Sequence, residues 1–218
     1  AYWLGRDVVE RLRYRLEGAA FDRRHNVETT SIIDRSILNV ADTNRTSRSY
    51  VATTPSAFSR LMQELGCPSN CPNQSCDSCT FVDLGSGKGR AVFLASRYPF
   101  SKIVGVELSR EIHETALRNL QAFSATGGGA GRIELVRGNA GEYRFPKGQL
   151  VVFIYDPFEG PIVKQILENL WRAVASGDST AYVIYLQPLE QGMFRDQPGF
   201  EEIFCDERQG VSIFKVSR

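Results

Sequence analysis

From Thr80 onward the sequence alternates short apolar stretches with amphipathic ones, and this alternation limits the fold more than any other feature. The stretches TFVDL, KIVGVEL, RIELVRGN, QLVVFIYDPF and TAYVIYLQP are typical of buried strands. Helical patterns separate them, among them SREIHETALRNLQAF and GPIVKQILENLWRAVAS. Such alternation predicts an α/β fold, a parallel sheet with helices on both faces. The final stretches FEEIFCDE and GVSIFKVSR have no helix between them, which predicts an antiparallel strand at one edge.

The residues before Thr80 have a different organisation. Residues 3–18 show apolar positions at helical spacing, including Leu12 and Leu16, whereas residues 20–50 are polar and irregular. The stretch TTPSAFSRLMQEL predicts a helix with Thr54 as its N-cap. We therefore expect an N-terminal helical or lid extension in residues 1–66, a cysteine-rich loop in residues 67–79, and the core of one structural domain in residues 80–218.

Charge and hydropathy disfavour several classes of protein. Lys and Arg number 26 against 25 Asp and Glu, so no overall field attracts the chain to nucleic acid or to a membrane surface. No run of about 18 apolar residues would span a bilayer. The first residues show no apolar stretch typical of a secretory signal, so the expected compartment is the cytoplasm.

The stretch FVDLGSGKGR ends the first strand of the core in a glycine-rich turn, where open parallel sheets bind their ligands. The phosphate loop G-x-x-x-x-G-K-[ST] is excluded because Gly89, not a hydroxyl residue, follows Lys88. The dinucleotide pattern G-x-G-x-x-G is disfavoured because Arg90 occupies the place of its third glycine. Asp83, just before the turn, would repel a pyrophosphate but suits a ligand that carries an amine.

Three further strand ends place polar or aromatic side chains at the same crevice. Glu107 ends the second strand and can accept hydrogen bonds from both hydroxyls of a ribose. Asn139 follows the third strand, where its amide offers a donor and an acceptor to a purine. The fourth strand leads into Tyr155, Asp156 and Phe158. Together with the glycine turn, these groups predict a ligand that combines an ammonium group, a ribose and a purine.

The order and spacing of VDLGSGKGR, IVGVELS, LVRGNA and IYDPF resemble class I S-adenosylmethionine-dependent methyltransferases over about residues 80–160. The resemblance implies a Rossmann-like, seven-stranded, mostly parallel sheet with an antiparallel edge strand and helices on both faces. More narrowly, FDRRHNVETT and YVATTPSAF, taken with the glycine-rich region, look like a bacterial group in that superfamily to which no substrate is assigned.

The resemblance also implies a cofactor, S-adenosyl-L-methionine, and the residues that bind it. Its methionine moiety would lie against Asp83 and the glycine turn, its ribose against Glu107, and its adenine beside Asn139 and Ala140. Residues from the N-terminal extension would close over it. The implied set is Asp83, Gly85, Ser86, Gly87, Gly89, Glu107, Leu108, Asn139, Ala140 and Asp156, with Tyr50, Thr53 and Thr54 from the N-terminal side.

The stretch YDPF stands where methyltransferases of amino groups carry Asp/Asn-Pro-Pro-aromatic, although the second proline is missing here. By this resemblance Asp156 would accept a hydrogen from an amine, while Tyr155 or Phe158 would pack beside a cationic or planar substrate. Asp156 could instead be the N-cap of the next helix. For His25 two roles stay open, a base folded over the site or a structural residue; His113 is expected at the surface.

Four cysteines precede the core in the stretch CPSNCPNQSCDSC. Cys67, Cys71, Cys76 and Cys79 have the spacing C-x3-C-x4-C-x2-C, which suits a tetrahedral structural zinc site. Disulfides, or reduced thiols in an exposed loop, stay open as alternatives. Cys205 lies in a predicted strand and is expected to be a buried, small apolar residue.

The sequence therefore predicts an S-adenosylmethionine-dependent methyltransferase that acts on an amino group of a protein or a small molecule. Nucleic acid is the alternative acceptor, disfavoured by the near-zero net charge and by the lack of a recognisable reading module. From another class, a non-catalytic protein could bind the cofactor for sensing or assembly. A nicotinamide oxidoreductase is a third hypothesis, disfavoured by Asp83 and Arg90.

Overall fold

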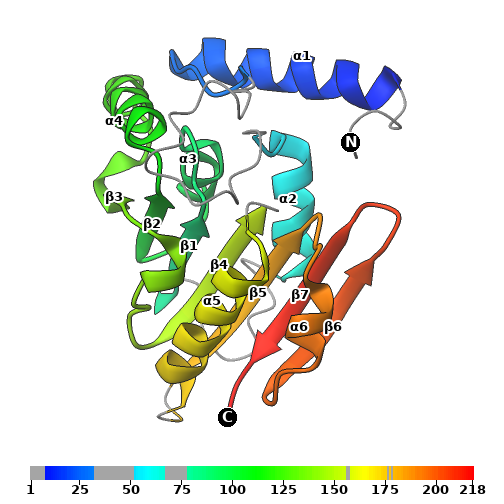
Figure 1. The fold of residues 1–218 in the computed structure, drawn as a ribbon. Helices are drawn as coiled ribbons and strands as arrows, with labels where there is room; N and C mark the ends of the chain where they lie inside the picture. Colours follow the sequence, from blue (N-terminus) through cyan, green and yellow to red (C-terminus); the bar gives the residue numbers. More distant parts are fainter. Residues whose placement is uncertain (1–7, 32–51, 67–77, 156–157, 176, 178) are drawn as a thin grey trace.

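The computed structural model describes residues 8–31, 52–66, 78–155, 158–175, 177 and 179–218, which build a single seven-stranded sheet with helices on both faces (Figure 1). The strands are β1 (Thr80–Leu84), β2 (Lys102–Glu107), β3 (Ile133–Arg137), β4 (Gln149–Tyr155), β5 (Thr180–Leu186), β6 (Phe200–Asp206) and β7 (Val211–Val216). The helices are α1 (Val8–His25), α2 (Pro55–Glu64), α3 (Arg90–Ala95), α4 (Arg110–Ala125), α5 (Gly160–Val174) and α6 (Gln191–Arg195), with 3-10 turns η5 (Ala130–Arg132) and η6 (Ala140–Glu142). Within these residues, no helix is long and apolar enough to cross a membrane.

The strand order is β3-β2-β1-β4-β5-β7-β6. The first five strands in this order are parallel, and β7 runs antiparallel to both of its neighbours. The chain reverses its direction of travel across the sheet at β1, which lies between β2 and β4, and ligands of such sheets bind at this switch point. The predicted fold class is confirmed, with the antiparallel strand one place in from the edge.

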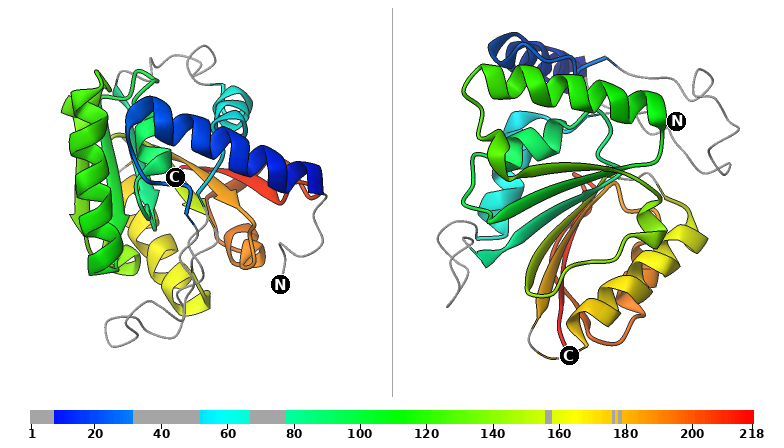
Figure 2. Two further views of the ribbon diagram at one scale, coloured as in Figure 1. Left: turned by 90° about the horizontal axis from the view of Figure 1, so that it is seen from above. Right: turned by 90° about the vertical axis from the view of Figure 1, so that its left-hand side faces the viewer.

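Two hydrophobic clusters cover the two faces of the sheet. Figure 2 shows α1, α2, α3 and α4 on one face and α5 and α6 on the other. The first cluster packs Phe58 of α2 against Phe81 and Phe153 of the sheet, with ring centroids 5.7–5.9 Å apart. The second packs Ile166 and Leu170 of α5 against the opposite face. Because both faces are covered, the central strands are apolar throughout rather than alternating.

Two N-caps, one of them the predicted Thr54, set the start of helices that flank the site. Thr54 Oγ1 accepts a hydrogen bond from the Ala57 amide at 3.2 Å, and Pro55 occupies the first turn of α2. Ser109 Oγ accepts from the Ile112 amide at 3.4 Å and starts α4 directly after β2. Both caps confirm the boundaries that the sequence predicts for these helices.

Helix α1 differs from its prediction in extent and in the face that it buries. The helix runs to His25, through residues whose polarity predicted a loop. Leu12 and Leu16 are 55% and 60% exposed, whereas Tyr14 and Phe21 are buried. The predicted burial is therefore wrong at Leu12 and Leu16, because the helix packs through aromatic residues and through polar groups that bind charges of the core.

Strand β6 corrects the prediction for Cys205. This residue is exposed rather than buried. Cys205 lies on the side of β6 that faces α6, since its Sγ is 3.6 Å from Gln191 Nε2 and 3.8 Å from Arg195 Nη2. Because β6 is the edge strand and α6 is only five residues long, this residue stays exposed to solvent.

Candidate functional site

The glycine turn lies at the carboxyl edge of the sheet, between β1 and α3. The amides of Gly85 and Ser86 both donate to the carbonyl oxygen of Val106 in β2, each at 2.9 Å. Gly85, Gly87 and Gly89 have φ values of 78°, 56° and 94°. Residues with a side chain rarely adopt this left-handed backbone conformation, so glycine is required for the turn to fold back against β2.

Glu107 supports this turn from the end of β2. One carboxylate oxygen accepts a hydrogen bond from the Gly87 amide at 2.9 Å, and the other accepts from the Ser109 amide at 2.8 Å. Burial raises the pKa of this carboxyl above its usual range. The acid predicted to hold a ribose thus lies directly beside the glycine turn.

Asp83 lies within the same edge of the sheet and is only 3% exposed. Burial, and then the nearby charge of Glu107, hold the pKa of Asp83 well above its usual range. The hydroxyl of Ser86 is also buried, and no hydrogen-bond partner for it exists within the described residues. A buried and a half-buried acid beside the glycine turn fit a ligand that brings an ammonium group and ribose hydroxyls, as S-adenosylmethionine would.

The residues predicted to bind adenine lie at the end of β3. Asn139 Oδ1 accepts from the Gly141 amide at 2.9 Å, and its Nδ2 donates to Glu142 Oε1 at 3.3 Å. The side chain therefore caps η6, which orders the backbone around the buried Ala140. Leu108 is half-buried directly after Glu107.

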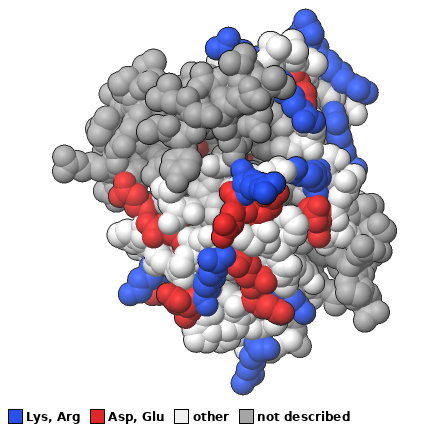
Figure 3. All heavy atoms as spheres, turned by 90° about the vertical axis from the view of Figure 1, so that its right-hand side faces the viewer, with Lys and Arg blue, Asp and Glu red and all other residues white. Residues whose placement is uncertain are grey.

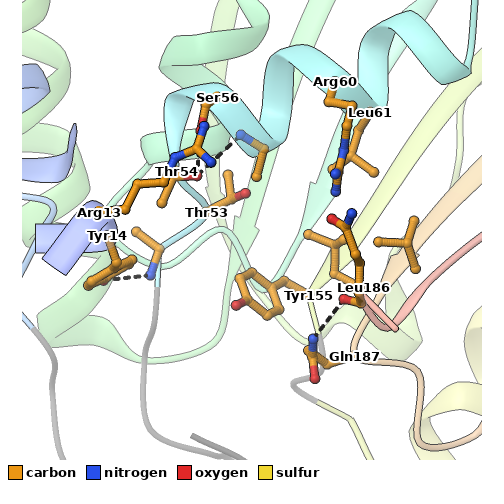
Figure 4. Close-up of a pocket in the computed structure, with 14 residues that line it drawn as sticks. Arg13, Tyr14, Thr53, Thr54, Ser56, Arg60, Leu61, Tyr155, Leu186 and Gln187 are labelled. Carbon is orange, nitrogen blue, oxygen red and sulfur yellow. Dashed lines mark hydrogen bonds between the residues drawn. The ribbon is translucent and has the colours of Figure 1, made fainter. Parts of the chain in front are cut away.

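A pocket of about 210 Å³ opens one strand farther along the edge, beyond β4 and β5 (Figure 4). Its walls come from α1, from the start of α2, and from the ends of β4, β5 and β7. The lining residues are Arg13, Tyr14, Ala52, Thr53, Thr54, Ser56, Ala57, Arg60, Leu61, Tyr155, Leu186, Gln187, Gln209 and Val211. The predicted residues Thr53, Thr54 and Tyr155 thus share one pocket, at the end of the strand next to β1.

The strained backbone of Gln187 forms the floor of this pocket. Its φ of 51° is unusual for a residue other than glycine. Its amide donates to the Gly210 carbonyl at 2.7 Å, and its Nε2 donates to the Gln209 carbonyl at 3.1 Å. These bonds tie the end of β5 to the turn before β7. Sequence reasoning missed this residue, because nothing in the pattern YLQP indicates a left-handed backbone.

Other predicted residues are separated from this pocket or cannot be placed. Phe158 is half-buried against the cluster under α5, so it does not line the pocket. Tyr50 and Asp156 lie outside the described residues, so their predicted roles stay predictions. His113 is half-buried on α4, and burial lowers its pKa.

His25 has the structural role that was one of its two predicted alternatives. Its ring lies between those of Phe21 and Phe123, with centroids 4.7 and 5.0 Å away. One ring nitrogen is 3.1 Å from the guanidinium of Arg97. Burial lowers the pKa of the ring. The histidine therefore fastens the end of α1 to the helical layer, away from the glycine turn.

The predicted zinc site can be followed only at Cys79. This residue is buried in the first hydrophobic cluster, at the start of β1. Cys67, Cys71 and Cys76 lie outside the described residues. Within the part of the chain that is described, no three or more His, Cys, Asp or Glu side chains are arranged to hold a metal ion. The zinc site stays a prediction.

Two basic residues of the glycine turn have a role that the sequence did not indicate. Lys88 and Arg90 are 2% and 1% exposed, and both form ion pairs with residues that follow or end α1. The sequence reasoning treated them only as departures from other glycine motifs. A buried lysine or arginine needs an acid, and FDRRHNVETT offers two, but nothing in the sequence indicates that these two cations are buried.

Comparison with known proteins agrees with this geometry. No protein-family model matches the sequence, and the search of curated proteins finds no match. A crystal structure described as a candidate RNA methyltransferase from Pyrococcus horikoshii is similar at a TM-score of 0.55 and 16% identity, over 95% of this chain and 98% of that one. The candidate methyltransferase yhhF from Escherichia coli is similar at a TM-score of 0.52 and 18% identity, over 75% of this chain and 86% of that one.

The 23S rRNA methyltransferase ErmE has a TM-score of 0.51 at 14% identity, over 75% of this chain and 67% of that one. Identities this low establish the fold and leave the reaction and the substrate to be argued from the site. The glycine turn, the two acids and the seven-stranded order β3-β2-β1-β4-β5-β7-β6 complete the case. The chain has the fold of the class I S-adenosylmethionine-dependent methyltransferases.

Proposed function

We propose that this protein is an S-adenosylmethionine-dependent methyltransferase. The observation that carries the proposal is the pair of acids with raised pKa values, the buried Asp83 and the half-buried Glu107, beside a glycine turn at the switch point of this fold. Asp83 would face the ammonium group of the cofactor, and Glu107 would accept hydrogen bonds from its ribose. The cofactor supplies an activated methyl group when bound. The protein has to align the acceptor and exclude water.

The pocket beyond β4 is the proposed site of the methyl acceptor. Tyr155, which lines it, lies next to β1 in the sheet order because β4 is the neighbour of β1. Figure 4 shows Tyr155 at the end of β4 below Thr53, with Arg60 and Leu61 of α2 to the right of both. An acceptor in this pocket would therefore lie one strand away from a cofactor over the glycine turn, with α1 and α2 shielding it.

The charges of the pocket support a neutral nucleophile. Arg13 and Arg60 line it, and the described lining residues include no carboxylate, although Glu17 pairs with Arg13 at 2.7 Å. The charge of Arg60 disfavours a cationic acceptor, whereas a neutral amine, or one on a substrate with negative charge, would fit. The amino group of a protein or a small molecule remains our first acceptor class. Its support is the stretch YDPF, whose Asp156 lies outside the described residues.

Nucleic acid is the second acceptor class. Two of the three structural neighbours named above carry RNA in their descriptions, but they share the fold with this chain at 14–16% identity. The face around β6 and β7 mixes acidic and basic side chains (Figure 3), including the Arg195–Glu202 ion pair at 2.7 Å. Around β6 and β7 the described residues thus form no extended basic surface of the kind that binds a phosphate backbone, although basic side chains gather at the upper right of this view.

Calorimetric titration with S-adenosylmethionine tests the cofactor site. We expect binding to the wild-type chain and a loss of about tenfold or more in affinity for Glu107→Gln, since a charged hydrogen-bond acceptor is lost. Glu201→Gln, an exposed substitution on β6, is the matched control and should bind as the wild type does. Equal affinity in all three proteins would refute the site.

Turnover separates an enzyme from a protein that only senses the cofactor. The wild-type chain is incubated with methyl-labelled S-adenosylmethionine and fractions of protein, RNA and small molecules from a matched lysate. We expect label in one fraction and a stoichiometric amount of S-adenosylhomocysteine. Cofactor binding without S-adenosylhomocysteine in any fraction would favour the sensor.

A further inference from the structure

Residues 22–31, which we call the crossing segment, pass over the glycine turn and are bound to it through buried side chains. Arg90 Nε donates to Thr29 Oγ1 at 2.5 Å, and its Nη2 donates to Thr30 Oγ1 at 2.6 Å. The same Nη2 lies 3.2 Å from Asp22 Oδ1. Asp22 also accepts from the amides of Thr29 and Thr30, at 3.0 and 2.8 Å. The aspartate thus shapes the segment that Arg90 binds.

A second set of contacts holds the other end of the crossing segment. Lys88 Nζ donates to Glu28 Oε1 at 2.7 Å and to the Ser31 carbonyl at 3.2 Å. The Asn119 side chain accepts from the Glu28 amide at 2.9 Å. Its Nδ2 donates to the carbonyls of Glu28 and Lys88, at 3.0 and 3.1 Å. One amide of α4 therefore bridges the segment and the backbone of the glycine turn.

The contacts continue from the crossing segment to the acceptor pocket through Tyr14. Its hydroxyl donates to the Thr30 carbonyl at 3.4 Å and accepts from the Ala52 amide at 3.3 Å. Tyr14 and Ala52 both line the pocket. Helix α1 packs closely against the crossing segment at Gly18. A Cβ atom there would lie 2.7 Å from Thr30 Oγ1 and 3.1 Å from Arg90 Nη1.

We infer that Lys88 and Arg90 are positioning residues: they clamp the crossing segment on the glycine turn and, through Tyr14, hold the α1 wall of the acceptor pocket. This inference rests on the proposed function for the identity of the two sites. The physical basis is that both cations are buried and need their partners. If the crossing segment moved away from the turn, each cation would lose its hydrogen-bond partners, which costs free energy. Cofactor binding at the turn and the shape of the pocket are thereby coupled.

The first test compares two arginine substitutions in the chain without ligand, by hydrogen exchange and mass spectrometry. Arg90→Lys keeps the charge but loses the planar fork. Arg132→Lys is the matched control, because Arg132 also bonds several backbone groups, including the carbonyls of Ser96 and Tyr98 at 3.0 and 3.2 Å, away from the crossing segment. We expect amides 52–57 to exchange about tenfold faster in Arg90→Lys and at the wild-type rate in Arg132→Lys. Equal rates at 52–57 in both variants would overturn the inference.

The second test uses milder variants and S-adenosylhomocysteine as the ligand. In the wild-type chain the ligand should protect both the turn 85–89 and residues 52–57. Tyr14→Phe should keep the protection of the turn and lose that of 52–57. Tyr98→Phe, in the core beside Phe58, should keep both. Full protection of 52–57 in Tyr14→Phe would contradict the link.

The two tests separate this inference from the proposed function. If the ligand does not protect residues 85–89 of the wild-type chain, the cofactor site is wrong, and the comparison without ligand still decides whether Arg90 positions the pocket wall. If the turn is protected but residues 52–57 of the wild type are not, the cofactor site stands and the coupling fails.

Discussion

Asp83 is a carboxyl group that folding makes harder to ionise. Its pKa in the folded chain is well above the usual value, because of burial and the neighbouring Glu107. The folded state therefore retains a proton that the unfolded chain has lost. By linkage, this residue lowers the free energy of unfolding as pH rises from about 4 toward the raised pKa. A cationic ligand would remove this penalty.

Asp83→Asn should therefore stabilise the protein without ligand at neutral pH and weaken cofactor binding. Removal of an ionisable buried group should raise the free energy of unfolding by roughly 1 kcal/mol or more, and affinity for S-adenosylmethionine should fall about tenfold or more. Urea denaturation and calorimetric titration measure the two effects. A variant that is less stable than the wild type at pH 8, or that binds as tightly, would speak against this role.

Cofactor binding should also release protons. Because the pKa values of Asp83 and Glu107 are raised, these carboxyl groups are protonated in a fraction of the protein molecules before binding. A cation beside them favours their ionised forms. Affinity should thus rise with pH until both groups are ionised. Titration calorimetry in two buffers of different ionisation enthalpy measures the released protons. Proton uptake on binding would contradict the assignment.

The sequence predicts these acids but not the residues that position them. Asp83 and Glu107 can be found because each follows a short apolar strand, and parallel strands end at one edge. Lys88 and Arg90 cannot be assigned in the same way, because their partners lie 57 to 68 residues away and nothing local pairs them. The pocket residue Gln187 is likewise hidden, since its backbone is set by contacts with the turn before β7.

At the scale of elements, β2 fits against the glycine turn without room for a side chain. A Cβ atom at Gly105 would lie 2.9 Å from each of Ser86 Oγ, Val92 Cγ2 and Leu135 Cδ2. The missing side chain at Gly105 therefore allows the glycine turn and β3 to approach β2 closely.

Gly105→Ala should disturb the turn and lower stability together. Overpacking of this kind costs about 1–3 kcal/mol, and affinity for S-adenosylmethionine should fall because Ser86 is displaced. Gly131→Ala, where a Cβ atom would meet open space, is the control and should leave the affinity unchanged. Thermal unfolding of both variants with and without the cofactor measures their stability and the stabilisation by the cofactor. Equal unfolding temperatures and equal stabilisation in Gly105→Ala and Gly131→Ala would argue against the close fit.

The sheet was more predictable than the helix that crosses its edge. Strands β1, β2 and β4 are buried on both faces, so the sequence shows them as continuous apolar runs between glycine and proline. Helix α1 buries Tyr14 and Phe21 among charged residues, and its last turn is basic. Local polarity therefore predicted a loop where long-range pairing extends a helix.

At the scale of the whole molecule, the crossing segment joins the N-terminal helix to the core through a buried charge. Asp22→Asn leaves Arg90 buried without its counter-ion, which should lower the free energy of unfolding by about 3–5 kcal/mol. Glu168→Gln removes an exposed pair with Arg172 on α5 and should cost less than about 0.5 kcal/mol. Urea denaturation measures both; similar midpoints would mean that the Asp22–Arg90 pair adds nothing.

These same contacts have a consequence for the order in which the chain folds. Asp22 and Arg90 are 68 positions apart, and Glu28 and Asn119 are 91 apart. Contacts of such separation form late, because the loop between them must first be closed. During synthesis α1 is made before the core, but its docking site is not complete until α4 has been translated. We expect the acceptor wall to be the last part of the site to assemble, and a nascent chain halted before residue 119 to have α1 unattached.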